Sequence, residues 1–123
     1  MNQEHWEAVA LLQWWAIESN RIERPQECLM AIPNQGRGGG WRNARRGAYM
    51  KKEGLRAGVP DYFLAIPVHD SPGLFIELKA KGGRVSDSQK RMSEILKQNG
   101  YRVFVCYGWE EAKECIQKYL RVS

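Results

Sequence analysis

The chain has 123 residues, which is long enough to bury one hydrophobic core, and we expect a single domain over residues 1–123. The 43% hydrophobic and 27% charged residues are ordinary for a soluble globular protein. The net charge of +5 favours a polyanionic partner, although modestly basic proteins without such a partner are about as common. No apolar run approaches the length needed to span a bilayer, and the first five residues lack the charged start and apolar core of a signal peptide.

The cysteines and histidines do not fit a structural zinc site. Cys28, Cys106 and Cys115 are an odd number with no Cys-x-x-Cys spacing, and the only histidines are His5 and His69. Free thiols fit a reducing compartment best, so we expect a cytoplasmic protein.

The first predicted element is a helix from Trp6 to Ile17. It is apolar on most sides, so we expect it to be buried over much of its surface. Glu4 and Glu7 lie in or just before its first turn, where carboxylates complement the helix dipole. After a polar connection, the apolar run from Leu29 to Pro33 predicts a short strand.

A basic, glycine-rich segment follows, from Asn34 to Gly47, with a short basic helix expected from Ala44 to Glu53. Glycine-rich backbone approaches phosphates closely, and arginines bind them through two hydrogen bonds. We therefore favour a nucleic-acid contact over the alternative of a flexible solvated loop. The candidate DNA-binding residues are Arg37, Arg42, Arg45 and Arg46, together with Lys81 and Arg84 of a later basic turn.

The stretch from Gly58 to Lys79 predicts two short strands joined by a hairpin, because turn-forming residues separate two apolar runs. Asp61 and Glu77 each lie eight positions from His69, so a hairpin folded about His69 places them directly opposite, on one face. Lys79 is two residues beyond Glu77 and shares that face. Like charges placed opposite each other are destabilising, so the two carboxylates indicate a bound cation or a function.

The remainder of the chain predicts a helix, a strand and a helix. Ser86 and Gln89 form a capping box at the start of a helix that ends at Gly100. A buried strand is expected over 101–107 and an amphipathic helix over 109–120. This order favours an α/β fold, in which a mixed central sheet is flanked by helices on both faces.

The charged face of the hairpin can be read as a metal site. A hard cation such as Mg²⁺ is held by one or two carboxylates, waters and substrate phosphate. Asp61 and Glu77 would supply the carboxylates, and the backbone carbonyl of Leu78 would add a third oxygen. Lys79 could orient the attacking water or neutralise charge on a phosphate, which predicts a phosphodiesterase site. The structural alternative is a same-face ion pair of Glu77 with Lys79, and an aspartate that only ends a turn.

Several motifs occur in a fixed order: Ala31-Ile32-Pro33-Asn34, Lys52-Glu53-Gly54, Gly58-Val59-Pro60-Asp61, Phe75-Ile76-Glu77-Leu78-Lys79 and Ser86-x-x-Gln89. From about Ala31 to Val105 the chain thus resembles the VRR-NUC family, a branch of the PD-(D/E)xK nucleases. The resemblance implies the helix-and-sheet core described above and cleavage of DNA with Mg²⁺ or Mn²⁺. It also implies that Asp61 and Glu77 are metal ligands. Lys79 would be the catalytic lysine, and Gln89 would face the site while still capping its helix.

Family members also carry a first-helix glutamate that faces the metal. Glu4 is the preferred match in this chain and Glu7 the second. The chain departs from the family pattern at Ala8, where a glutamine often stands, and at Gln35, which replaces the usual first glycine after the asparagine.

At this length the chain resembles small members that look like phage or prophage proteins and act as homodimers on branched DNA, including four-way (Holliday) junctions. We therefore expect a structure-selective DNA endonuclease in a bacterial or phage-infected cell, with Trp14 or Trp15 as candidates for the dimer contact. One alternative is a sequence-specific restriction-type nuclease. Another is a non-catalytic DNA-binding module, against which the joint presence of Asp61, Glu77 and Lys79 argues.

Overall fold

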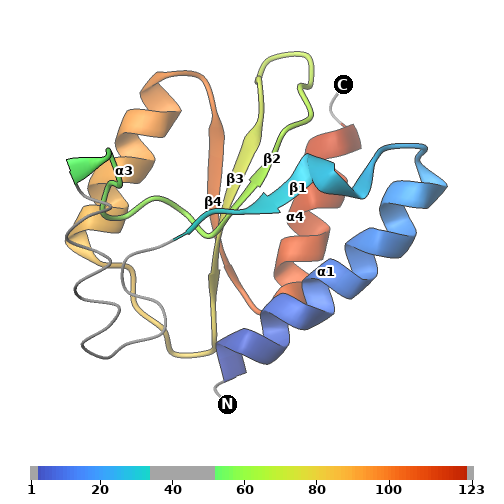
Figure 1. The fold of residues 1–123 in the computed structure, drawn as a ribbon, viewed down its shortest axis with the longest axis horizontal. Helices are drawn as coiled ribbons and strands as arrows, with labels where there is room; N and C mark the ends of the chain where they lie inside the picture. Colours follow the sequence, from blue (N-terminus) through green and yellow to red (C-terminus); the bar gives the residue numbers. More distant parts are fainter. Residues whose placement is uncertain (1–2, 34–51, 122–123) are drawn as a thin grey trace.

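A computed structural model describes residues 3–33 and 52–121, which form a sheet with helices packed on it (Figure 1). The strands lie in the order β1-β2-β3-β4. The first three are antiparallel neighbours, whereas β3 and β4 are parallel, so the sheet is mixed as predicted. Their bounds are β1 Leu29–Ala31, β2 Tyr62–Leu64, β3 Leu74–Lys79 and β4 Arg102–Tyr107.

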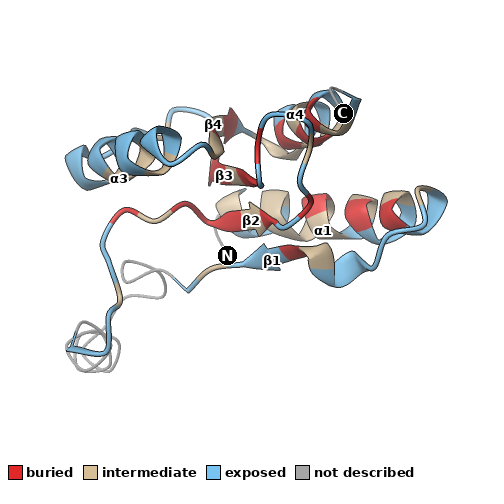
Figure 2. Ribbon diagram, turned by 90° about the horizontal axis from the view of Figure 1, so that it is seen from above, coloured by how far each residue is buried: buried red, intermediate tan, exposed pale blue. Residues whose placement is uncertain are grey.

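Helices cover both faces of this sheet, which confirms the predicted α/β architecture. Figure 2 shows α1 and α4 on one side of the strands and α3 on the other. A short 3-10 turn, η1 (Gln26–Cys28), links α1 to β1. The helices are α1 Gln3–Arg21, α3 Asp87–Gln98 and α4 Trp109–Arg121, and none of the described helices is long and apolar enough to cross a membrane.

The hydrophobic core lies between the sheet and the pair α1 and α4. Alternate residues of β3 are fully buried in it: Leu74, Ile76 and Leu78. Leu11 from α1 and Ile116 from α4 pack in the same cluster. Because side chains alternate along a strand, the intervening residues of β3 face α3 instead. One face of the hairpin is thus apolar, as predicted.

On the α3 side, aromatic rings cover the sheet next to the charged residues. Phe63 and Phe75 have ring centroids 4.5 Å apart, and Tyr101 meets Phe75 edge-on at 5.3 Å. Rings in these arrangements contribute packing energy beyond the area they bury. This cluster separates the charged end of β3 from the hairpin tip.

The prediction that the first helix is buried over much of its surface is wrong. Only Leu11, Trp15 and Ser19 are buried, a single stripe with a spacing of four residues, whereas Trp6 is 53% and Ile17 74% exposed. A helix that packs on one side of a sheet buries only the stripe that faces it. Trp15 is also wrong as a dimer contact, since it is fully buried and its Nε1 donates to the backbone oxygen of Gln26 at 2.8 Å.

The strand predicted over 101–107 exists as β4, but it is an edge strand rather than a buried one. Phe104 is 45% and Tyr107 41% exposed, while Val103 and Cys106 are buried. The apolar run alone does not show which strand ends the sheet. The basic helix expected over 44–53 lies almost wholly outside the described residues, as do Arg37, Arg42, Arg45 and Arg46.

Candidate active site

The hairpin register brings the two predicted carboxylates together. Tyr62 pairs with Ile76 and Leu64 with Leu74, so the hairpin folds about position 69 as predicted. A bridge between Val68 and Ser71 closes its tip. Continuing this register by one residue places Asp61, just before β2, opposite Glu77 of β3.

Asp61 is held by backbone on both sides. Its Oδ2 accepts a hydrogen bond from the backbone nitrogen of Leu78 at 2.8 Å, and its own carbonyl accepts from the nitrogen of Ile32 at 2.8 Å. The residue is 1% exposed. A short carboxylate anchored in this way has little freedom, so its position relative to β3 is fixed by the sheet.

Glu77 is buried beside Asp61, and this burial changes its electrostatics. Its Oε2 accepts from Nε2 of Gln89 at 2.9 Å and lies 3.5 Å from Nζ of Lys79. Its Oε1 is buried and accepts no hydrogen bond from any described residue. Burial first, and then the charge of Asp61, raise the pKa of Glu77 to about 7, although Lys79 acts in the opposite direction.

Gln89 caps α3, as predicted, and also contacts Glu77. Its Oε1 accepts from the backbone nitrogen of Ser86 at 2.9 Å, and its backbone nitrogen donates to Oγ of Ser86, which completes the capping box at the start of α3. Its Nε2 is directed the other way, to Glu77. The cap therefore locks the amide in the orientation that presents its donor to the buried carboxylate.

A close backbone approach seats the start of α3 on the loop before β2. Gly58 has φ of +83°, and a Cβ there would lie 2.2 Å from the carbonyl oxygen of Ser88 and 2.8 Å from the nitrogen of Gln89. Only glycine combines this left-handed backbone with this contact. Gly58 thus packs against the first turn of α3, and Asp61 follows it three residues later in the same motif.

Lys79 ends β3 and lies under the basic turn that follows. Gly83 folds back on it, because the nitrogen of Gly83 donates to the carbonyl of Ala80 at 2.9 Å, and a Cβ on Gly83 would lie 3.3 Å from Cβ and Cδ of Lys79. The Lys79 side chain is 14% exposed. Lys81 and Arg84, in the turn that follows β3, are exposed.

The two first-helix glutamates differ in what they contact. Glu7 caps α4: its Oε1 accepts from the backbone nitrogen of Trp109 at 2.9 Å, and its Oε2 accepts from Gln3 at 2.6 Å. Sequence reasoning missed this role, and no local pattern indicates it. Glu4 is half-buried, one turn earlier on α1. Its predicted role at the metal stays a prediction.

The donors at the end of β3 fit a divalent cation. Two buried carboxylates lie side by side, and one oxygen of Glu77 lacks a hydrogen-bond donor, a combination that a doubly charged ion would satisfy. Residues 3–33 and 52–121 hold no cluster of three or more histidine, cysteine or acidic side chains poised as ligands.

A mixed sheet that carries buried carboxylates and a lysine at one strand end, with helices on both faces, defines an α/β domain of the nuclease type. The model of the VRR-NUC domain matches residues 2–110, so the chain belongs to the VRR-NUC domain family and has a nuclease-type function in DNA processing. A solved structure entitled "VRR_NUC domain protein" has the same fold, with a TM-score of 0.79 at 24% identity, covering 100% of this chain and 92% of that chain. A comparison with curated proteins found no match.

Proposed function

We propose that the protein is a divalent-metal-dependent DNA endonuclease that hydrolyses phosphodiester bonds. The observation that carries the proposal is the state of Glu77: a carboxylate buried beside Asp61, with one oxygen that no described residue satisfies. A pure DNA-binding module gains nothing from burying two like charges, since burial of an unpaired charge is costly. A metal-dependent hydrolase needs them.

Asp61 and Glu77 would hold Mg²⁺ or Mn²⁺, with the backbone carbonyl of Leu78 as a third oxygen. Glu4 would have to move toward them to become a further ligand, since the described residues hold no cluster of three acidic side chains. The bound ion would supply Lewis-acid activation of the phosphodiester and of the attacking water. The protein contributes rigidity. Asp61 is fixed by the nitrogen of Leu78, and Glu77 is fixed by Gln89.

Lys79 is the proposed catalytic lysine. Its Nζ lies 3.5 Å from Oε2 of Glu77, so its positive charge is already directed at the site in the absence of substrate. From there it can donate to a phosphate oxygen and stabilise the negative charge that develops during hydrolysis. Gln89 serves as a positioning residue that keeps Glu77 in place, and it can also face the substrate.

The substrate we propose is DNA with a branch, such as a four-way junction, cut by a homodimer in the cytoplasm of a bacterial or phage-infected cell. Lys81 and Arg84, exposed beside Lys79, would contact the backbone together with the arginines of the glycine-rich segment. A sequence-specific restriction-type nuclease would use the same site. Cleavage assays on branched and linear DNA separate the two, and light scattering tests the dimer.

The decisive experiment is cleavage of four-way junction, flap and linear duplex with Mg²⁺, Mn²⁺ or EDTA. Asp61→Asn, Glu77→Gln and Lys79→Met should each abolish cutting while DNA binding in EDTA persists. Glu94→Gln and Lys97→Met are matched controls on the exposed face of α3 and should cut normally. Absence of cutting by the wild type with either metal would refute the enzyme proposal, and normal cutting by Lys79→Met would refute the role of that lysine.

A further inference from the structure

Tyr107 lies beside Lys79, on the next strand of the sheet. The two residues are register partners in the parallel pair of β3 and β4, and neighbouring strands are about 5 Å apart. The ladder continues one residue further, where the nitrogen of Gly108 donates to the carbonyl of Lys79 at 2.9 Å. Register partners point to the same face of a sheet, so Tyr107 shares with Lys79 the face that carries Glu77.

The backbone of Tyr107 is fixed, whereas its side chain is open to solvent. Its nitrogen donates to Oε1 of Glu111 at 2.9 Å, and Gly108, with φ of +92°, then turns the chain into α4. Tyr107 is 41% exposed at the end of an edge strand. Its phenol forms no hydrogen bond with any residue in the ranges 3–33 and 52–121. The sheet therefore holds a phenol with an unused hydrogen-bond donor next to the proposed catalytic lysine.

The free room around Lys79 is on the side of Tyr107. The β2 side is filled by Asp61, which is 1% exposed and would repel a phosphate that no cation bridges. Gly83 covers the stem of Lys79, since a Cβ there would lie 3.3 Å from Cδ of the lysine. In the part of the chain that the structure describes, no strand lies beyond β4. A DNA strand with one phosphate at Lys79 thus has space over Tyr107.

We infer that Tyr107 is a further DNA-binding residue of this site, an inference that rests on the proposed nuclease function. Its phenol donates a hydrogen bond to the phosphate next to the one that Lys79 contacts. Tyrosine is among the side chains that commonly contact DNA phosphates. Successive phosphates of one strand are about 3.4 Å apart along the duplex axis, the same order as the separation of β3 and β4. Lysine acts as a point charge, so a directional donor beside it fixes the orientation of the strand to be cut.

The test is Tyr107→Phe, which removes only the hydroxyl. DNA binding is measured in EDTA, with the four-way junction, flap and linear duplex named above, and cleavage is measured with Mg²⁺. Loss of a hydrogen bond to a charged acceptor should weaken binding about tenfold. The salt dependence of binding should keep the slope of the wild type, because tyrosine neutralises no phosphate charge. Stability in urea should be unchanged, since the hydroxyl has no partner in the described structure.

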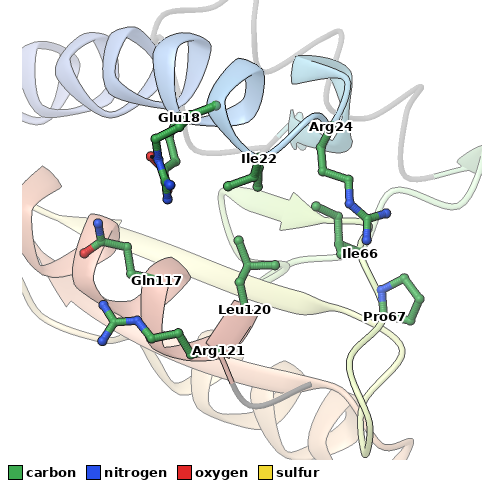
Figure 3. A pocket seen from close by; sticks show the side chains of 9 residues that line it. Glu18, Ile22, Arg24, Ile66, Pro67, Gln117, Leu120 and Arg121 are labelled. Atoms are coloured by element: carbon green, nitrogen blue, oxygen red, sulfur yellow. Dashed lines mark hydrogen bonds and ion pairs between the residues drawn. The ribbon is translucent and has the colours of Figure 1, made fainter.

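Two control variants remove polar groups elsewhere. Tyr101→Phe makes the same change just before β4, where the ring of Tyr101 packs edge-on against Phe75. Gln117→Ala removes a polar side chain from a hollow of about 350 Å³ between the last turns of α1 and α4 (Figure 3). Ile66 lines this hollow and lies beyond the first residue of β3, at the end of the strand away from Lys79. Both controls should bind and cut DNA as the wild type does.

The outcomes separate this inference from the proposed function. Wild-type binding by Tyr107→Phe would overturn the phosphate contact and leave the carboxylate site unaffected. Weak binding by Tyr107→Leu but not by Tyr107→Phe would also overturn it, because the ring alone would then meet the DNA. An equal loss in Tyr101→Phe, or a smaller salt slope, would do the same. If the wild type binds DNA without cutting it and Tyr107→Phe binds about tenfold more weakly, the contact stands and only the enzyme proposal fails.

Discussion

Replacing Gly58 by alanine tests how α3 is coupled to the carboxylates. A Cβ at this position would lie 2.2 Å from the carbonyl oxygen of Ser88, while ordinary contact begins at about 3.4 Å. The first turn of α3 must therefore retreat by about 1 Å. The hydrogen bond from Gln89 to Glu77, now 2.9 Å long, would be stretched beyond a useful length.

Two costs add up in this variant. A non-glycine residue in the left-handed region costs about 1–2 kcal/mol, and overpacking costs about 1–3 kcal/mol. Gly58→Ala should thus lower the free energy of unfolding by about 2–5 kcal/mol. Because a displacement of about 1 Å in an active site can cost about a hundredfold in rate, DNA cleavage should fall by about that factor.

Gly100→Ala is the matched control at the other end of α3. Gly100 has φ of +93°, and a Cβ there would meet only Cδ of Pro72, at 3.9 Å. This variant carries the backbone strain without the clash, so it should lose about 1–2 kcal/mol and cut DNA normally. Urea denaturation and initial cleavage rates measure both effects. Equal stability and equal rates in the two alanine variants would refute the idea that contact at Ser88 positions Gln89.

Two further predictions concern the acidic residues. The pKa of Glu77 is about 7 in the fold against 4.5 ordinarily, so without metal its contribution to stability is intact below pH 4.5, falls by about 3 kcal/mol as the pH rises to 7 and is then constant. The difference in urea stability between the wild type and Glu77→Gln, measured in EDTA, should follow this curve. A difference that does not change with pH would contradict the raised pKa. Glu7→Gln should lower stability by about 1 kcal/mol through the N-terminus of α4, with normal metal-dependent stabilisation in a thermal melt. Glu4→Gln should instead weaken the stabilisation by Mg²⁺ in the same melt, and an unchanged Mg²⁺ response would contradict its role as a ligand.

The site was predictable where its geometry follows from local rules. The equal distance of Asp61 and Glu77 from His69 fixed their pairing, because a hairpin register depends only on where the chain turns. The spacing of Ser86 and Gln89 is that of a capping box, a pattern that spans one turn of helix. In both cases the residues that must meet lie close together in the sequence or on one hairpin.

The features that sequence reasoning missed depend on distant contacts. Glu7 reaches the nitrogen of Trp109, which is 102 residues away, and nothing near either residue indicates the partner. Likewise, Trp14 and Trp15 are neighbours of the same type, yet only Trp15 is fully buried. Which apolar side of α1 faces the core is decided by α4 and β3, so the pattern of one helix cannot supply it.

The charged residues at the two ends of β3 are paired differently. At the hairpin end, Asp70 and Arg102 form a conventional ion pair at 2.8 Å, partly exposed, in which each charge has its partner. At the other end Glu77 is buried beside Asp61, and Nζ of Lys79 lies 3.5 Å from its Oε2. A structural role would favour the first arrangement at both ends, because an incompletely paired buried charge destabilises the fold. A divalent cation would balance the two carboxylates at Glu77, which is why we propose the metal site at that end of the sheet.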